Sequence, residues 1–456
     1  MYKRIGFITC VIFFILLNPG FANAEEISVT DEETLTAALK EAQDGDVIIL
    51  EAGEYQGNFT IEASIELIGE EGAHIKGLDT GYPVLIEADD VVIDNLHVEG
   101  GGTDAAGIFS RGDRNEIKNN KISNVFHGVL VREGYANVIT GNNISSWDEL
   151  KGSKRYGYGI YVIEGDSAVI AGNQTYDTQD GAWVSHSTLA QITNNRFINA
   201  RYGVHTMYAS DVAITHNEVR GSYNGGMIMQ SENITIKNNY FHLNTISDGS
   251  GIFGYDLFDS SISDNIIKGN SKGIMLSYAQ GNRIHNNEIT ENVRGLELGE
   301  GATNNWIYLN NFKKNTQQVI TVPENENDFN VDEIGNYWDD QQIVDLQDDG
   351  TNDFAYKSGD VFYQMIERDP FLQVFFESPT IRLWNTIEQY THLPSDTHVI
   401  DEYSLTEPVE VVQQIEVYTP QEEQMAFMNP VGLALLFVLV IGISFITIYL
   451  SRRKTT

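Results

Sequence analysis

The stretch GVHTMYASDVAITHNEV, from Gly203 to Val219, alternates apolar and polar residues. The alternation has the two-residue period of β-strands and is broken by residues that favour turns. The unit recurs along the chain, because Gly181, Gly203 and Gly225 follow one another at intervals of 22 residues. The same register holds Gly107, Gly128, Gly159, Gly251, Gly273 and Gly295. An internal repeat therefore organises the middle of the chain.

A repeat of this length with several short strands predicts one turn of a right-handed parallel β-helix, an all-β solenoid whose turns lie ~4.8 Å apart. Asparagine tolerates left-handed backbone geometry and bonds to neighbouring backbone, so it can stack into ladders at the corners. Asparagines follow most of the repeat glycines by 14 residues, at Asn142, Asn173, Asn195, Asn217, Asn239, Asn265 and Asn287. We place the β-helix at residues 25–320 and expect a short capping helix from Thr34 to Ala42.

Two further segments are apolar and lie at the ends of the chain. Residues 1–24 have the basic start, apolar stretch and Ala-Asn-Ala cleavage site of a secretory signal peptide, with an uncleaved anchor as the alternative. Residues 431–450 are apolar enough to cross a bilayer as a single transmembrane helix. The basic tail, residues 451–456, is expected in the cytoplasm. The sequence thus predicts a single-pass protein of the cell membrane with its ectodomain outside the cytoplasm.

The charge distribution limits the kinds of partner. The chain has 456 residues with 28 Lys and Arg against 65 Asp and Glu, a formal charge of −37. All the acidic residues and 23 of the basic ones lie between the two ends, which leaves −42 there. So acidic an ectodomain favours cations and argues against a nucleic-acid partner. The single cysteine, Cys10, lies in the signal segment, so thiolate chemistry and disulfides are excluded once that segment is removed.

Aligning the repeats on glycine separates a core face from an outward face. The first and third positions after glycine hold small or branched apolar residues, such as Val204 and Ile228, and should point into the core. The second and fourth positions should then face outward, yet they form an apolar and aromatic stripe. Such a stripe marks a partner surface, a ligand groove or a face covered by another segment. Its candidate partner-binding residues are Phe109, Leu130, Tyr161, Trp183, Phe253 and Tyr255.

Soft ligands gather on this stripe. His205 and Met207 lie one turn from Met227 and Met229, and Met275 lies two turns further along the same line. Imidazole and thioether ligands suit copper(I), so these five residues are a candidate copper site. The alternative is that they pack beneath a covering loop or partner, because methionine is an adaptable apolar residue.

Several stretches resemble the NosD family. They are RYGVHTMYAS, GGMIMQSENITIKNN and KGIMLSYAQGNRIHNN, followed by EIGNYWDD, DDGTNDFAY and RDPFLQVFFESPTIRLW. The resemblance covers about Leu35 to Ile387. Single repeats occur in many β-helix proteins, whereas their ordered combination with the Gly335-Asn336-Tyr337-Trp338 block is more specific.

The resemblance implies a function that composition does not show. NosD proteins are exported β-helix proteins of nitrous-oxide reductase maturation, often described as periplasmic copper-binding proteins. They assemble with an ABC-type ATPase and a membrane permease, and the β-helix docks a membrane copper chaperone and nitrous-oxide reductase. The resemblance therefore implies an accessory subunit that supports copper delivery and is not an enzyme. This chain departs from many members by its C-terminal membrane helix, which leaves the form of the assembly open.

Residues 321–375 form an acidic and aromatic module. Within it, Asp345, Gln347, Asp349 and Asp353 stand at positions 1, 3, 5 and 9 of a calcium loop, with glycine at position 6. Glutamine at position 3 and tyrosine at position 12 depart from that pattern, so an Asp-rich turn is the alternative.

Residues 376–430 are expected to form a helix and a stalk to the membrane. Ser378 and Pro379 suit the start of a helix. Its amphipathic face would contact the permease or the solenoid through Leu383, Trp384 and Ile387.

A different class of function stays open, because many parallel β-helices cleave or epimerise acidic polysaccharides. Such sites combine clustered carboxylates with a base, often Arg or Lys. Arg111 and Arg132 stack in the outward register, but the aligned positions show no carboxylate cluster beside them, and the Asp-Pro-His-Asp motif of alginate epimerases is absent. The outward aromatics could stack on sugar rings. The alternatives are therefore a carbohydrate-binding protein or polysaccharide lyase or epimerase, and an adhesion spike.

Overall fold

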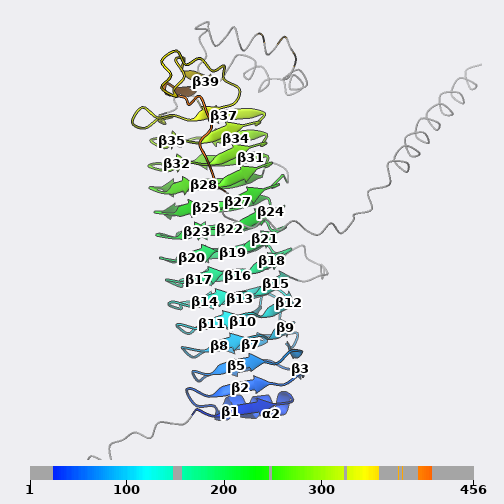
Figure 1. Ribbon diagram of the computed structural model, residues 1–456. Coiled ribbons are helices and arrows are strands. Elements are labelled where there is room, and N and C mark those ends of the chain that lie inside the picture. Colours follow the sequence, from blue (N-terminus) through cyan, green and yellow to red (C-terminus); the bar gives the residue numbers. More distant parts are fainter. Residues whose placement is uncertain are drawn as a thin grey trace, which may run out of the picture. The chain divides into compact units, whose positions relative to one another are not determined.

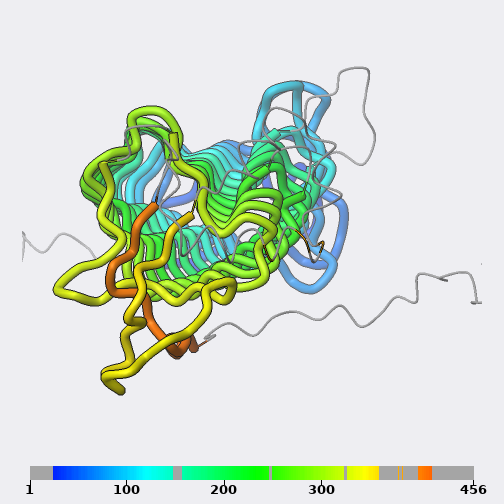
Figure 2. Tube along the Cα trace, turned by 90° about the horizontal axis from the view of Figure 1, so that it is seen from above, coloured from blue at the N-terminus to red at the C-terminus, as the bar shows by residue number. Residues whose placement is uncertain are grey.

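The computed structural model describes residues 24–146, 157–245, 249–322, 326–358 and 399–412, together with Ser378, Thr380 and Leu383. Within these ranges the chain winds into a solenoid of stacked turns (Figure 1). Successive turns lie over one another when the stack is seen along its axis (Figure 2). Three sheets of 13, 12 and 13 strands form the sides, and neighbouring strands within each are parallel. The predicted all-β parallel solenoid is confirmed, as is its period, since Met207 pairs with Met229.

The first sheet consists of β1 (Glu26–Val29), β2 (Val47–Leu50), β5 (Glu66–Gly69), β8 (Val92–Asp94), β11 (Glu116–Lys118), β14 (Val138–Thr140), β17 (Val169–Ala171), β20 (Gln191–Thr193), β23 (Ala213–Thr215), β26 (Thr235–Lys237), β29 (Ser261–Ser263), β32 (Arg283–His285) and β35 (Trp306–Tyr308). The second sheet consists of β4 (Phe59–Ile61), β7 (Val84–Ile86), β10 (Ala106–Ser110), β13 (His127–Arg132), β16 (Ile160–Ile163), β19 (Asp180–Ser185), β22 (Tyr202–Met207), β25 (Asn224–Glu232), β28 (Ser250–Phe258), β31 (Lys272–Ser277), β34 (Arg294–Leu298) and β37 (Gln317–Thr321). The third consists of β3 (Gly53–Gln56), β6 (Ala73–Lys76), β9 (His97–Glu99), β12 (Lys121–Val125), β15 (Asn143–Ser146), β18 (Gln174–Tyr176), β21 (Arg196–Ile198), β24 (Glu218–Arg220), β27 (Tyr240–His242), β30 (Ile266–Lys268), β33 (Glu288–Thr290), β36 (Asn311–Lys313) and β38 (Tyr337–Trp338).

The core and the N-terminal cap follow the sequence pattern. Core positions such as Val204 and Ile228 are fully buried. Helix α2 (Glu32–Glu41) starts two residues before the predicted helix, because Asp31 accepts a hydrogen bond from the backbone N–H of Thr34 and forms its N-cap. Its buried Leu35 belongs to the same apolar core as the strands. The helix therefore closes the first turn against water.

A ladder of buried asparagines joins the turns, as predicted. The side-chain amide of Asn195 donates to the side-chain oxygen of Asn217 in the next turn (3.0 Å) and to the carbonyl of Ile170 in the turn before (2.8 Å). Each amide thus satisfies groups of both neighbouring turns. The ladder comprises Asn120, Asn142, Asn173, Asn195, Asn217, Asn239, Asn265, Asn287, Asn310 and Asn336.

The ladder ends on a buried aspartate from a distant part of the chain. Asp401 lies in β40 (Val399–Asp401), which pairs antiparallel with β39 (Tyr356–Ser358). Its carboxylate accepts hydrogen bonds from the backbone N–H of Asn336 (2.7 Å) and from Nε1 of Trp338 (2.9 Å). A Cβ on Gly335 would lie 2.0 Å from the same carboxylate, so only glycine fits there. The Gly-Asn-Tyr-Trp block is therefore the last rung of the ladder and the start of its cap.

This cap lies beyond residue 320, where the sequence placed the end of the β-helix. The third sheet continues past residue 320 to β38, where Trp338 stacks between Phe312 (4.3 Å) and Tyr356 (4.0 Å). Residues 399–412, expected in the stalk, supply Asp401 to the end of the solenoid. The sequence missed this contact because 65 residues separate Asp401 from Asn336.

The predicted membrane segments lie outside these ranges. Residues 1–23 of the signal segment and the span 431–450 are not among the described residues. In the part of the chain that is described, we find no helix with the length and apolar character needed to cross a bilayer.

Asp401 gives the cap a pH dependence. Burial raises the pKa of Asp401 from 3.8 to about 6, although hydrogen bonds from Trp338 and Asn336 oppose the rise. A raised pKa in the folded state means that the contribution of Asp401 to stability is fully present below about pH 4 and is lost as the pH rises through about 6. The shift corresponds to ~3 kcal/mol. We therefore expect the melting temperature of the wild type, relative to that of Asp401→Asn, to fall between about pH 4 and about pH 7.

Thermal unfolding followed by circular dichroism measures this difference. Glu402→Gln is the matched control, because Glu402 is the exposed neighbour of Asp401 and should leave the pH dependence unchanged. The same pH dependence in the wild type and Asp401→Asn would contradict the assignment.

Candidate functional site

The second sheet places four of the five candidate copper ligands together. His205 pairs with Met227, and Met207 pairs with Met229, on the neighbouring strands β22 and β25. Met275 is set apart, because Phe253 of β28 stands between it and Met227 in the register. The predicted quartet is therefore contiguous, and its fifth member is two turns away.

A buried carboxylate orients His205. Its Nδ1 lies 2.9 Å from Oδ2 of Asp180, which is fully buried. Arg201 donates to both oxygens of Asp180, at 2.9 and 2.8 Å. The other ring nitrogen, Nε2, is buried and has no hydrogen-bond partner. An imidazole held by a carboxylate at one nitrogen, with the second nitrogen unused, has the arrangement typical of metal-binding histidines.

Aromatic side chains surround this histidine. Trp183 stacks on the imidazole of His205 with ring centroids 5.1 Å apart, and Tyr202 contacts it edge-on at 5.1 Å. Trp183 in turn stacks on Tyr161 at 4.4 Å. The candidate partner residues Tyr161 and Trp183 thus also form a wall beside His205, and such a wall lowers the local dielectric and strengthens polar interactions.

The sulfur atoms differ in what they contact. Met207 and Met229 are half-buried, and Met227 is buried with its sulfur 3.4 Å from the side-chain amide of Asn224. The sulfur of Met275 lies 3.3 Å from the ammonium group of the buried Lys272. A positive charge at that distance opposes a bound cation. Met275 is therefore the least suited of the predicted ligands.

Sequence reasoning missed Asp180 because alternation breaks at each repeat glycine. A Cβ on Gly203 would lie 2.1 Å from the side chain of Val219 in the interior, and the next residue, Val204, is also buried. The glycine and the residue after it therefore both face inward. The residue before the glycine then faces outward, on the same side as the second residue after the glycine. The signal was present in the sequence, because polar or aromatic residues precede the repeat glycines at His127, Tyr158, Asp180, Tyr202, Asn224, Ser250, Lys272 and Arg294.

The other candidate partner residues divide into covered and accessible ones. Phe109 and Leu130 are buried in a small apolar cluster of their own, packed by Tyr82, Leu85, Tyr161 and Ile163. Cover by neighbouring parts of the chain was one of the three interpretations of the stripe, and it holds for these two residues. Phe253 and Tyr255 are half-buried, and Leu383 is 62% exposed. Trp384 and Ile387 lie outside the described residues.

The candidate calcium residues lie in an exposed turn. The carboxylate of Asp345 accepts backbone hydrogen bonds from Asp348, Asp349 and Gly350, and that of Asp353 accepts one from Leu346. Gln347 donates to Asp353, and Asp349 accepts from the backbone of Thr351. These bonds are those of an Asp-rich turn, while calcium binding by Asp345, Gln347, Asp349 and Asp353 stays a prediction.

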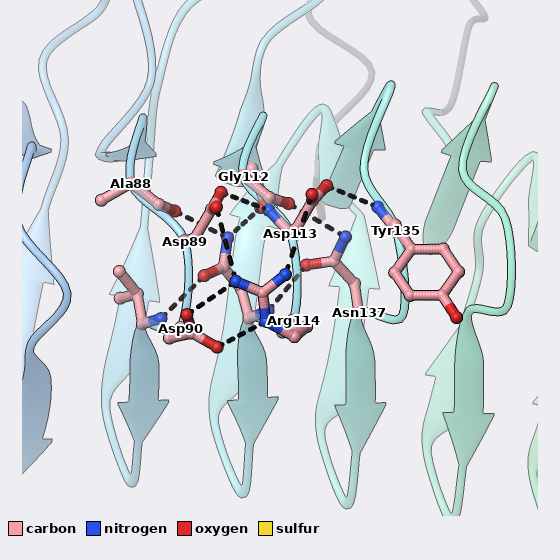
Figure 3. Close-up of polar contacts among 11 residues, drawn as sticks. Ala88, Asp89, Asp90, Gly112, Asp113, Arg114, Tyr135 and Asn137 are labelled. Atoms are coloured by element: carbon pink, nitrogen blue, oxygen red, sulfur yellow. Dashed lines mark hydrogen bonds and ion pairs between the residues drawn. The ribbon is translucent and has the colours of Figure 1, made fainter.

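Of the two arginines of the alternative function, Arg111 has a carboxylate partner that the sequence alignment did not reveal, whereas Arg132 is exposed, with its guanidinium 6.0 Å from the ring centroid of Phe109. Arg111 lies 2.9 Å from Glu87, which stands one turn below it, outside the aligned repeats. At the next corner, Arg114 binds Asp90 through two hydrogen bonds of 2.7 Å, while Asp113 accepts a backbone N–H from Tyr135 (Figure 3). The aligned positions did not include Glu87, because the alignment began one turn later.

Comparisons with known proteins agree with the sequence motifs. The family model described as "Periplasmic copper-binding protein (NosD)" matches residues 147–342, which include the quartet. Two relatives named "Probable ABC transporter binding protein NosD", from Stutzerimonas stutzeri and Pseudomonas aeruginosa, are each 29% identical over 75% of this chain, and the alignments cover 82% and 83% of their lengths. These matches support the resemblance to the NosD family. The matched family is described as periplasmic and copper-binding, which agrees with the location outside the cytoplasm and the copper expected from the sequence.

Solved structures resemble this chain in fold alone. The A-module of the mannuronan C-5 epimerase AlgE6 from Azotobacter vinelandii has a TM-score of 0.53 at 14% identity, covering 65% of this chain and 93% of its own. The AlgE4 A-module has a TM-score of 0.52 at 15% identity, covering 67% and 99%. At such identities the likeness carries no statement about activity.

If the quartet is a copper site, copper(I) should bind to the wild type and not to a variant that lacks the four side chains. The full-length protein in detergent should bind one equivalent of copper(I) in competition with a chromophoric chelator. Replacing His205, Met207, Met227 and Met229 by alanine should abolish this binding. Asp180→Asn should weaken it roughly tenfold or more, because a lost second contact of a ligating histidine costs that much.

Met275→Ala is the matched control and should leave the curve unchanged, because its sulfur contacts Lys272. Superimposable curves for the wild type and the quadruple variant would remove the site.

Proposed function

We propose that this protein is the external accessory subunit of an ABC-type transporter complex that supports copper delivery to nitrous-oxide reductase and its maturation. The observation that carries the proposal is the His205–Asp180 pair beside three methionines on adjacent turns. The quartet lies in the segment that the copper-binding family model matches.

The ligand set suits copper(I) as a cargo that is held and then released. His205 offers Nε2 in an orientation fixed by Asp180, and the thioethers offer neutral soft donors. Cys10 is the chain's single cysteine, so no thiolate of the solenoid can tighten the binding. The half-buried Met207 and Met229 leave part of the site open to a ligand from a donor or an acceptor. The acidic ectodomain raises the local concentration of cations.

The partners follow from the relatives and from the exposed surface. The relatives' names, "Probable ABC transporter binding protein", support contact with an ABC-type ATPase and a membrane permease. A membrane copper chaperone would supply copper, and nitrous-oxide reductase would receive it. We assign these contacts to the part of the stripe that stays accessible, at Phe253 and Tyr255, and to Leu383. Residues 431–450 would anchor the protein in the membrane.

The second candidate is a carbohydrate-binding protein or a polysaccharide lyase or epimerase. The observations that favour it are the epimerase-like fold and the aromatic faces of Tyr161 and Trp183, which could stack on sugars. Against it, Arg111, one of the two arginines on which this alternative rests, is engaged by Glu87 of the same chain. A negatively charged ectodomain would also repel an anionic polysaccharide.

Purification of the full-length protein from native membranes in mild detergent tests the proposal. We expect an ABC-type ATPase and a permease in comparable amounts, identified by mass spectrometry. The variant with alanine at His205, Met207, Met227 and Met229 should retain these companions but lose copper, because the substitutions leave the backbone register intact. Recovery of the protein alone, together with depolymerisation of acidic glycans by the purified chain, would overturn it.

A further inference from the structure

We propose that His74, His97 and Glu99 form a second metal site, for a divalent transition ion of the Zn²⁺ class. The three residues lie on β6 and β9, at neighbouring turns of the third sheet. The quartet lies on the second sheet, so this site is separate from it and does not rest on the proposed function.

The geometry gathers three ligand atoms at one place. His74 pairs with His97 in the register, and their rings stack with centroids 4.1 Å apart and planes inclined by 8°. Nε2 of His74 lies 3.2 Å from Oε2 of Glu99. One ligand atom from each residue lies within 4.8 Å of the others. Among the described residues, this is the one group of three His, Cys, Asp or Glu side chains that meets this condition.

The positions of the ligand atoms leave room for a metal ion. Nε2 of His74 is buried and has no aligned hydrogen bond, although Oε2 of Glu99 is close. The side-chain amide of Asn124 donates to Oε1 of Glu99 (3.0 Å), so this contact orients the carboxylate. A buried polar atom without a hydrogen-bond partner calls for an explanation, and an ion between these residues would supply it.

The ligand set selects the class of ion. Two imidazoles and one carboxylate form a set found in catalytic zinc sites, which keep a fourth position for water or another ligand. The site offers no thioether, so it should discriminate against copper(I). The side chains of His74 and Glu99 are 22% and 28% exposed, which gives an ion access. Lys76, the register partner of Glu99, lies 3.7 Å from Glu54, so its charge is partly compensated.

A second contact holds the site in place. Nε2 of His97 lies 2.8 Å from Oγ of Ser123 on β12, the next strand of the sheet. This contact orients the ring of His97. The sequence signal was the pair AHIKG and LHVEG, in which histidine recurs at the same place in successive turns. Aligning the repeats on the glycines of the second sheet did not reveal this pair of histidines.

Calorimetric titration of the full-length protein with Zn²⁺ tests the site. We expect one equivalent to bind to the wild type and binding roughly tenfold or more weaker in Glu99→Gln and in the double variant His74→Gln, His97→Gln. His285→Gln is the matched control, since it removes a half-buried imidazole from another sheet, and it should bind like the wild type. Cu²⁺ bound in place of Zn²⁺ should show two coupled nitrogens in its electron paramagnetic resonance spectrum.

Identical Zn²⁺ isotherms for the wild type and the double variant would overturn the proposal. If the double variant has a lower melting temperature than the wild type, the Zn²⁺ isotherm of Glu99→Gln decides whether the site exists. This variant removes a partly exposed carboxylate and keeps both imidazole rings. Wild-type Zn²⁺ binding by a folded Glu99→Gln, with no two-nitrogen spectrum, would likewise reject the site. Zn²⁺ has little affinity for thioethers, so failure here would leave the quartet's copper(I) binding untouched.

Discussion

The buried amide ladder is the interaction on which the rest of this structure depends. A parallel solenoid turns its backbone at corners that water cannot reach, and unpaired polar groups there would cost about 1–3 kcal/mol each. Asn217 satisfies such groups in both neighbouring turns. Its side-chain amide donates to the carbonyl of Ile192 and to the side-chain oxygen of Asn239, and its own side-chain oxygen accepts from the amide of Asn195. Repetition of the same bond fixes the register of the turns from Asn120 to Asn336. The ladder then needs an end, and Asp401 supplies an acceptor that has no further turn to serve.

Register converts sequence spacing into the geometry of the candidate copper site. Since residues 22 apart become neighbours across a sheet, His205 meets Met227, and Met207 meets Met229. The backbone bend at the repeat glycine adds Asp180 from the turn below His205. No loop is needed to assemble these groups, so the site is as rigid as the sheet that carries it.

The limits of sequence prediction follow the same physics. Repetition revealed the fold class, the period, the asparagine ladder and the quartet, because each depends on spacing alone. The contact of Asp180 with His205 was not predicted, because a bend interrupts the alternation. The contact of Glu87 with Arg111 was not predicted, because Glu87 lies before the aligned repeats. The contact of Asp401 with Asn336 was not predicted, because the two residues are 65 positions apart and Asp401 is not part of a repeat. Burial of Phe109 depends on packing by Tyr82, which spacing does not encode.

We propose above that the solenoid holds copper(I) at His205 through nitrogen and sulfur ligands. X-ray absorption at the copper edge, on the full-length protein loaded with one equivalent of copper(I), tests it most directly. We expect a coordination shell with one imidazole nitrogen and two or more thioether sulfurs, and loss of the imidazole scattering in His205→Gln. A shell of oxygen and nitrogen alone, unchanged by His205→Gln, would contradict it.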